Sequence, residues 1–121
     1  MSKLQETVTT YGAAWQEEHP EWRLKLLTTA LNEKGRYTDP TADLVGPKAL
    51  CDHIGVFQVG NPGAKIEVTS TATLHHDIAH FTWRMLLPDG QVRLTGHDFA
   101  EFDEDGKILR LAGFFGDPDP L

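Results

Sequence analysis

The sequence predicts an α+β domain in which three N-terminal helices pack on one face of a curved antiparallel β-sheet. Two observations support this prediction. From residue 4 to about residue 59, apolar side chains recur at spacings of three and four, which is the helical period. Beyond residue 65 the chain becomes rich in β-branched residues and alternates between apolar and polar positions, which is the strand period. Helices that come first, with strands after them, are typical of the α+β class.

The first half of the chain contains three predicted helices. The apolar face of the first is formed by Leu4, Val8, Tyr11 and Trp15, and the pair His19-Pro20 ends it. The second is predicted over residues 21–32, with an apolar stripe formed by Trp22, Leu26, Leu27, Ala30 and Leu31, and Gly35 is expected to end it. The third is predicted from Pro47 to about residue 59, with one face formed by Leu50, His53, Ile54 and Phe57.

The rest of the chain is predicted to be extended. A short extended piece over residues 36–38 precedes a rigid turn at Asp39-Pro40, because proline keeps the residue before it out of the helical region. Four strands are predicted over residues 65–74, 78–87, 91–102 and 107–115, with turns at residues 76–77, 88–90 and 103–106. Sequential hairpins of this kind form a meander. We expect one domain over residues 1–116 and a flexible tail over residues 117–121.

Charge and composition argue against several classes of partner. The 121 residues carry a formal net charge of −7 and no basic run, so neither nucleic acid nor an anionic membrane surface is an expected partner. A single cysteine, Cys51, excludes an internal disulfide, and the first residues lack the apolar segment of a secretory signal, so the cytoplasm is the expected compartment. His75, His76 and His80 straddle a turn at which at most two of them could converge. No cofactor motif is present either, so we expect no metal and no cofactor.

Asp98 is the strongest candidate for a functional residue. Strand alternation places it on the face of Leu94, Gly96 and Ala100, and places Thr95, His97 and Phe99 on the opposite face. The matching apolar sets on the neighbouring strands are Phe81, Trp83 and Met85 on one side, and Leu109, Leu111, Gly113 and Phe115 on the other. An ionised carboxylate buried without a partner is costly, so such a group is usually neutralised, paired or used. A carboxyl group that is hydrogen-bonded inside the core would give the same pattern.

Tyr11, Asp39 and His53 are further candidates, and each has a structural alternative. Tyr11 could be an ordinary core aromatic whose hydroxyl reaches water. Asp39 could form a turn by accepting hydrogen bonds from its own backbone, and His53 could be a structural histidine on a helix face. If these groups meet Asp98 in one apolar pocket, acid/base chemistry is expected, because burial raises the pKa of a carboxyl group toward neutrality.

Three features of the sequence together resemble the nuclear transport factor 2-like superfamily. They are the order of three helices and a four-strand meander, the segment Tyr37-Thr38-Asp39-Pro40 and the run from Asp98 to Ile108. Within it, the chain is most similar to SnoaL-like polyketide cyclases and ketosteroid isomerases. This resemblance implies a cone in which the curved sheet wraps the first helix and a deep apolar cavity opens at the wide end.

The resemblance to ketosteroid isomerase also implies roles for single residues. Asp39 matches the general base of that enzyme, Asp98 matches the protonated aspartate of its oxyanion hole, and Tyr11 can match the oxyanion tyrosine. Phe81, Met85 and Phe115 match positions that line the cavity. His53 departs from the pattern because it places an ionisable ring where the isomerase has an aromatic lining residue.

These observations predict a cofactor-free enzyme that binds a small apolar or aromatic molecule and transfers a proton next to a carbonyl group. In this hypothesis Asp39 or His53 takes the proton, while Tyr11 and a neutral Asp98 donate hydrogen bonds to the oxyanion. Cyclisation, dehydration or epoxide hydration could use the same groups. The predicted ligand contacts are Trp15, Phe57, Phe81, Trp83, Met85, Leu111 and Phe115. The alternative is a module of the same fold that binds a ligand or a partner without turnover.

The outer face of the predicted sheet carries Thr95, His97 and Phe99. A phenylalanine on that face would be exposed in a monomer, and proteins of the superfamily that the chain resembles commonly pair through this surface. We therefore expect a homodimer.

Overall fold

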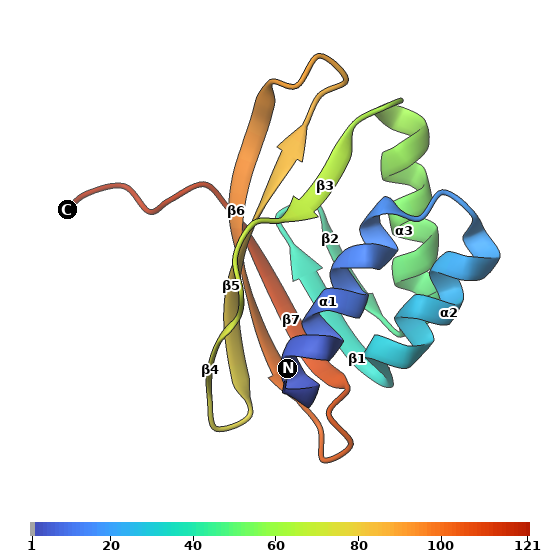
Figure 1. Cartoon of the computed structure of the whole chain (residues 1–121), viewed down its shortest axis with the longest axis vertical. Coiled ribbons are helices and arrows are strands. Elements are labelled where there is room, and N and C mark those ends of the chain that lie inside the picture. Colours follow the sequence, from blue (N-terminus) through green and yellow to red (C-terminus); the bar gives the residue numbers. More distant parts are fainter. Residues whose placement is uncertain (1) are drawn as a thin grey trace.

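The computed structural model describes residues 2–121, in which three helices pack on the inner face of a strongly curled sheet (Figure 1). The helices are α1 (Lys3–Gln16), α2 (Pro20–Ala30) and α3 (Pro47–Gly60). The strands are β1 (Leu31–Asp39), β2 (Ala42–Val45), β3 (Lys65–Val68), β4 (Thr73–His75), β5 (Ile78–Leu86), β6 (Val92–Phe102) and β7 (Ile108–Phe115). The predicted α+β class, with helices covering one side of a curved sheet, is confirmed.

Local sequence explains where the helices begin. Ser2 caps α1, because its hydroxyl accepts a hydrogen bond from the backbone N–H of Gln5 at 3.1 Å. Pro20 and Pro47 open α2 and α3, at a position where the missing N–H group costs no hydrogen bond. The buried Arg23 then ties the helices together. Its guanidinium donates to the carbonyl oxygens of Glu17 and Cys51 and to Gln58 Oε1, and this fixes α3, which carries His53, against the α1–α2 connection.

The sheet is mixed rather than wholly antiparallel. Its strand order is β2-β1-β7-β6-β5-β3, with β4 paired to β5, and β1 runs parallel to β7. The meander predicted for residues 78–115 is present as β5, β6 and β7, whereas the segment predicted as one strand over residues 65–74 forms the two strands β3 and β4.

The predicted end of the second helix was wrong. The helix ends at Ala30, and the chain from Leu31 to Asp39 forms β1 instead of the last helical turn and a short extended piece. The parallel partner of β1 lies far along the sequence, with Leu31 opposite Ile108 and Tyr37 opposite Leu111, so local periodicity could not show the pairing. Gly35 does not end a helix. It lies in a register shift of β1, where a β-carbon would stand 2.7 Å from Leu31 Cδ1.

A bulge also changes the inner face of the last strand. The register of β6 and β7 shifts between Glu101 and Phe102, so Phe102 pairs with Ile108. Ile108 is therefore fully buried, while Leu109, which alternation had placed inward, is 39% exposed. Leu111 and Gly113 lie on the inner side as expected.

The last residues, 117–121, extend away from the body of the molecule (Figure 1). Asp117 is tied to the sheet through His97, whose Nε2 lies 2.8 Å from Asp117 Oδ1. Among the residues that the structure describes, no helix has the length and apolar character needed to cross a membrane.

Candidate functional site

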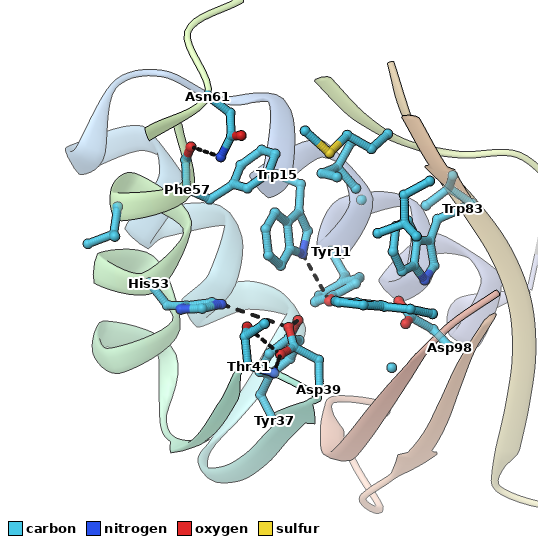
Figure 2. Close-up of a pocket in the computed structure, with 18 of the residues that line it drawn as sticks. Tyr11, Trp15, Tyr37, Asp39, Thr41, His53, Phe57, Asn61, Trp83 and Asp98 are labelled. Atoms are coloured by element: carbon cyan, nitrogen blue, oxygen red, sulfur yellow. Dashed lines mark hydrogen bonds and ion pairs between the residues drawn. The ribbon is translucent and has the colours of Figure 1, made fainter. Parts of the chain in front are cut away.

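A cavity of about 440 Å³ lies between α1, α3 and the inner face of the sheet (Figure 2). Its lining includes all four ionisable residues proposed from the sequence, which are Tyr11, Asp39, His53 and Asp98. The predicted apolar contacts that line it are Trp15, Phe57, Trp83, Met85 and Phe115. The fold therefore brings together side chains from α1, β1, α3, β5, β6 and β7.

Phe81 and Leu111, which were also predicted to contact a ligand, do not line this cavity. Both are almost completely buried in the core. Phe81 lies against the ring of Tyr11, with ring centroids 6.3 Å apart in an edge-on arrangement, and Leu111 pairs with Tyr37 and Ala100 within the sheet. The two residues share the inner face of the sheet with the lining residues, but packed core side chains fill the space around them.

Asp39, at the end of β1, accepts three hydrogen bonds. The hydroxyl of Tyr37 donates to Oδ2 at 2.5 Å, and the backbone N–H and the hydroxyl of Thr41 each donate to Oδ1 at 2.7 Å. The bonds from Thr41 are those of a turn-forming aspartate, so Asp39 organises the β1–β2 turn in addition to lining the cavity.

Tyr37 was not among the predicted site residues. It lines the cavity, and burial together with the neighbouring tyrosine and carboxyl groups raises its pKa far above the ordinary value. Its hydroxyl therefore stays protonated and is committed to Asp39. One feature of the sequence could have revealed it, because residues two apart on a strand point to the same side and Tyr37 is two positions before Asp39.

His53 enters the cavity from α3. Its Nε2 lies 3.8 Å from Asp39 Oδ2, a distance that forms an ion pair when the imidazole is protonated. The ring stands edge-on to Trp15, with centroids 6.2 Å apart, and lies 6.0 Å from the ring of Tyr37. The aromatic neighbours hold the imidazole beside the carboxylate.

The hydroxyl of Tyr11 acts as a hydrogen-bond acceptor but not as a donor within the described residues. It accepts a hydrogen bond from Trp15 Nε1 at 2.9 Å, but among residues 2–121 it donates to no acceptor. Burial raises the pKa of Tyr11 well above its ordinary value, and the nearby carboxyl of Asp98 raises it further. Tyr11 is therefore a neutral hydrogen-bond donor whose proton is available to a molecule in the cavity.

Asp98 is 7% exposed and accepts no hydrogen bond from the side chains and backbone that the structure describes. Burial raises its pKa to about 7, and the negative charge of Asp39 contributes to the rise. The indole of Trp83 opposes the rise. However, the buried Nε1 of Trp83 has no partner at hydrogen-bond geometry, so it acts on Asp98 as a nearby donor rather than as a bonded one.

The histidines considered for a metal site lie outside this cavity. His75 and His76 contact each other at the β4–β5 turn, and His80 contacts His97 on the outer face of the sheet. Within the described residues, no three His, Cys, Asp or Glu side chains are grouped closely enough to hold a metal ion.

Three helices on a strongly curled mixed sheet, with a cavity at their junction, define the nuclear transport factor 2-like or cystatin-like fold. A protein of cystatin-like fold from Methylobium petroleophilum shares this arrangement, with a TM-score of 0.77, 14% identity, and coverage of 98% of this chain and 78% of that one. The curated protein sequences contain no match to this chain.

The comparisons also identify the family. A family model described as a SnoaL-like domain matches residues 8–111. A candidate isomerase of the SnoaL-like family from Agrobacterium tumefaciens is 30% identical, with a TM-score of 0.89 and coverage of 97% of this chain and 100% of that one. A candidate SnoaL-like polyketide cyclase from Jannaschia has a TM-score of 0.72, 14% identity, and coverage of 93% of this chain and 85% of that one. The chain belongs to the SnoaL-like family.

Proposed function

We propose that the protein is a cofactor-free enzyme that binds a small, largely apolar molecule and moves a proton next to a carbonyl group, as an isomerase or cyclase does. The observation that carries this proposal is the meeting of five ionisable side chains in one mostly apolar cavity, which are Tyr11, Tyr37, Asp39, His53 and Asp98. Buried titratable groups that differ in environment within one pocket are typical of acid/base sites. The SnoaL-like neighbours described as an isomerase and a cyclase support the same class of reaction.

The two sides of the cavity have different roles in this proposal. On one side, His53 takes the proton from the carbon, and Asp39 stabilises the resulting imidazolium across 3.8 Å. Asp39 accepts three hydrogen bonds, which engage its carboxylate oxygens. These bonds favour His53 as the group that takes the proton and Asp39 as the group that stabilises the charge. On the other side, Tyr11 and a protonated Asp98 donate hydrogen bonds to the oxygen on which negative charge develops.

The test is deuterium exchange at the acidic carbons of 2-tetralone, a planar ketone, followed by proton NMR in heavy water. The wild-type protein should accelerate the exchange above the buffer rate, and 2-naphthol, which resembles the enolate, should inhibit it. Binding of both molecules without any acceleration would overturn the enzyme proposal and favour a binding module without turnover. Failure of both to bind would overturn the proposed ligand class as well.

We also propose that the protein is a homodimer paired through the outer face of its sheet. Phe99 and Phe114 are 43% and 56% exposed on this face, with ring centroids 5.9 Å apart, and His80 stacks on Phe99 at 4.6 Å. An exposed aromatic cluster of this kind is typical of an interaction surface. Light scattering should give twice the chain mass of 13.5 kDa at micromolar concentration, and Phe114→Glu should halve it. A wild-type mass near 13.5 kDa across that range would contradict the dimer.

A further inference from the structure

Asn61 is a polar residue in the lining of the cavity that the proposed proton transfer does not use. Its backbone N–H and its side-chain Nδ2 both donate to the carbonyl oxygen of Phe57, at 2.9 and 3.0 Å. Because a carbonyl oxygen only accepts, the amide nitrogen must face Phe57 and the amide oxygen must point elsewhere. Figure 2 shows this arrangement, with the nitrogen of Asn61 turned toward Phe57.

The amide oxygen of Asn61 is open to contact. Within residues 2–121, no donor reaches Asn61 Oδ1. Trp83 Nε1 is the one side-chain polar atom of these residues that lacks a partner and is completely covered by the protein, and Asn61 is only part-buried. Asn61 Oδ1 is therefore a free acceptor that water or a bound molecule can reach.

The local sequence holds Asn61 in place. Helix α3 ends at Gly60, and Pro62 keeps the residue before it out of the helical region, where Asn61 has φ −135° and ψ 66°. Gly63 follows with φ +77°, and a β-carbon on it would stand 2.9 Å from Pro88 Cγ. The turn after α3 therefore lies against the turn between β5 and β6, while the Asn61 side chain is bonded to its own helix.

The C-terminal end of α3 offers hydrogen-bond acceptors and no positive charge. Its last turn contains no basic residue. The carbonyl groups of a last helical turn have no partners within the helix, and together they give this end a partial negative charge. Gly60, the last residue of α3, lines the cavity beside Asn61. A hydrogen-bond donor is therefore favoured here over an acceptor or an anion.

The two polar ends of the cavity lie far apart along one helix. Eight residues separate His53 from Asn61, which corresponds to about 12 Å along the axis of α3. Figure 2 shows the two side chains at different heights on α3, with Phe57 between them. The wall between them is aromatic, because Trp15 stands edge-on to both His53 and Phe57, with ring centroids 6.2 and 5.9 Å apart. A molecule that fills this space is apolar in the middle and polar at both ends.

We propose that Asn61 Oδ1 accepts a hydrogen bond from a hydroxyl or N–H group of the bound molecule, at the end opposite the carbonyl group that reacts. The inference rests on the proposed function, because it requires that the reacting end lies beside His53 and Tyr11. It narrows the ligand class to elongated, flat, apolar molecules with a carbonyl or enol oxygen at one end and a hydrogen-bond donor at the other. Asn61 is then a specificity-determining residue.

The first experiment compares three 4-hydroxybiphenyl probes that differ only at the 4′ position, which carries a hydroxyl, a methoxy or a methyl group. Only the hydroxyl probe has a donor at its far end. Calorimetric titration should show that the wild-type protein binds it about 3- to 10-fold more tightly than the other two, as expected for one hydrogen bond. In ¹³C-labelled protein, the side-chain carbonyl resonance of Asn61 should move further with the hydroxyl probe than with the methyl probe.

The second experiment changes the acceptor. Asn61→Leu keeps the size of the side chain and removes Oδ1, so the preference for the hydroxyl probe should disappear. Asn61→Asp keeps an acceptor but removes the Nδ2 bond to Phe57, so it should retain the preference. Asn32→Leu is the matched control, because Asn32 also donates one side-chain hydrogen bond, to Asp103, but does not line the cavity. It should keep the wild-type preference. Comparing ratios of affinities between proteins cancels the different hydration and symmetry of the probes.

The outcomes separate this inference from the proposed function. If the three probes bind in the cavity equally tightly, or if Asn61→Leu keeps the preference, the inference is wrong while the proposed ligand site stands. Loss of the preference in Asn61→Asp as well would assign the effect to the end of α3 and also overturn the inference. Should no probe bind, the inference and the proposed ligand class would both fail. If Asn61→Leu does not fold, the Asn61 carbonyl resonance of the wild-type protein decides the question, since equal movement with the hydroxyl and methyl probes contradicts the proposed bond.

Discussion

The cavity has two carboxyl groups whose surroundings differ. The side chain of Asp39 is 6% exposed and accepts three hydrogen bonds, from Tyr37 and Thr41. Asp98, which is 7% exposed as a whole residue, accepts none within the described residues, and burial raises its pKa to about 7. The fold therefore supplies donors to one carboxyl group and none to the other.

This difference indicates that the two carboxyl groups have different chemical roles. A carboxylate that accepts several hydrogen bonds is held in one orientation, and this suits it to orienting and stabilising a neighbouring imidazolium. A carboxyl group without donors is half protonated near neutral pH and can donate or accept a proton there. The same residue type thus supports two roles on opposite sides of one cavity, and each prediction below changes one side only.

The largest effect is expected from His53→Gln on the Asp39 side. Glutamine keeps a polar side chain of similar size but cannot take a proton, so exchange of 2-tetralone should fall about 10²- to 10⁴-fold. The affinity for 2-naphthol should change little. His75→Gln, on the exposed β4–β5 turn, is the control and should exchange at the wild-type rate. Full activity in His53→Gln, with loss of activity only in Asp39→Asn, would instead make Asp39 the base.

The second-largest effect is expected from Asp98, which should make a large contribution to the pH dependence of the free energy of unfolding. An ordinary aspartate has a pKa of 3.8, while that of Asp98 in the folded state is about 7. Between these values the folded protein holds a proton that the unfolded chain has lost. The contribution of Asp98 to the free energy of unfolding is therefore highest at pH 4 and falls as pH rises to 7, by up to about 4 kcal/mol.

Asp98→Asn removes this titration. Urea unfolding across pH 4 to 8 should show that the variant gains stability relative to wild type as pH rises, while it binds 2-naphthol more weakly. Carbon NMR of the Asp98 carboxyl gives a direct check. Parallel stability curves for the two proteins, or a carboxyl that titrates near 4, would mean that the group is solvated.

The smallest effect is expected for the tyrosines that flank the two sides. Tyr37→Phe removes a buried donor to the Asp39 carboxylate and should lower the free energy of unfolding by about 1.5–3 kcal/mol. Tyr11→Phe removes a hydroxyl that accepts one bond and donates none to the described residues, so its loss of stability should be smaller and its loss of 2-naphthol affinity larger. Thermal and urea unfolding together with calorimetric titration would measure both. The reverse ranking would contradict the proposed roles.

Much of this molecule could be predicted from local patterns. The apolar stripes of α1 and α3, the turns at residues 88–90 and 103–106 and the alternation along β6 depend on neighbouring residues alone. The stripe predicted for the second helix was wrong at Trp22, which is 55% exposed. Alternation was enough to place Asp98 on the buried face, and its raised pKa follows from that burial.

Other features depended on contacts between distant segments. The parallel pairing of β1 with β7 makes Leu31–Asp39 a strand, and that strand turns Tyr37 toward Asp39. The bulge at Glu101 and Phe102 turns Ile108 inward in place of Leu109. The closed core places Phe81 and Leu111 away from the cavity, although their strand faces are the predicted ones.

The sequence by itself determined the apolar face of an element wherever its period is unbroken, as along β6, because a side chain's face then follows from the period of its own element. Only the tertiary structure decided which of those side chains reach the cavity, because that depends on sheet register and helix packing. The donors to Asp39 are local, since Tyr37 and Thr41 each lie two residues from it. Asp98 differs because no donor from any described segment reaches it at hydrogen-bond geometry, and that spatial fact leaves its carboxyl available for chemistry.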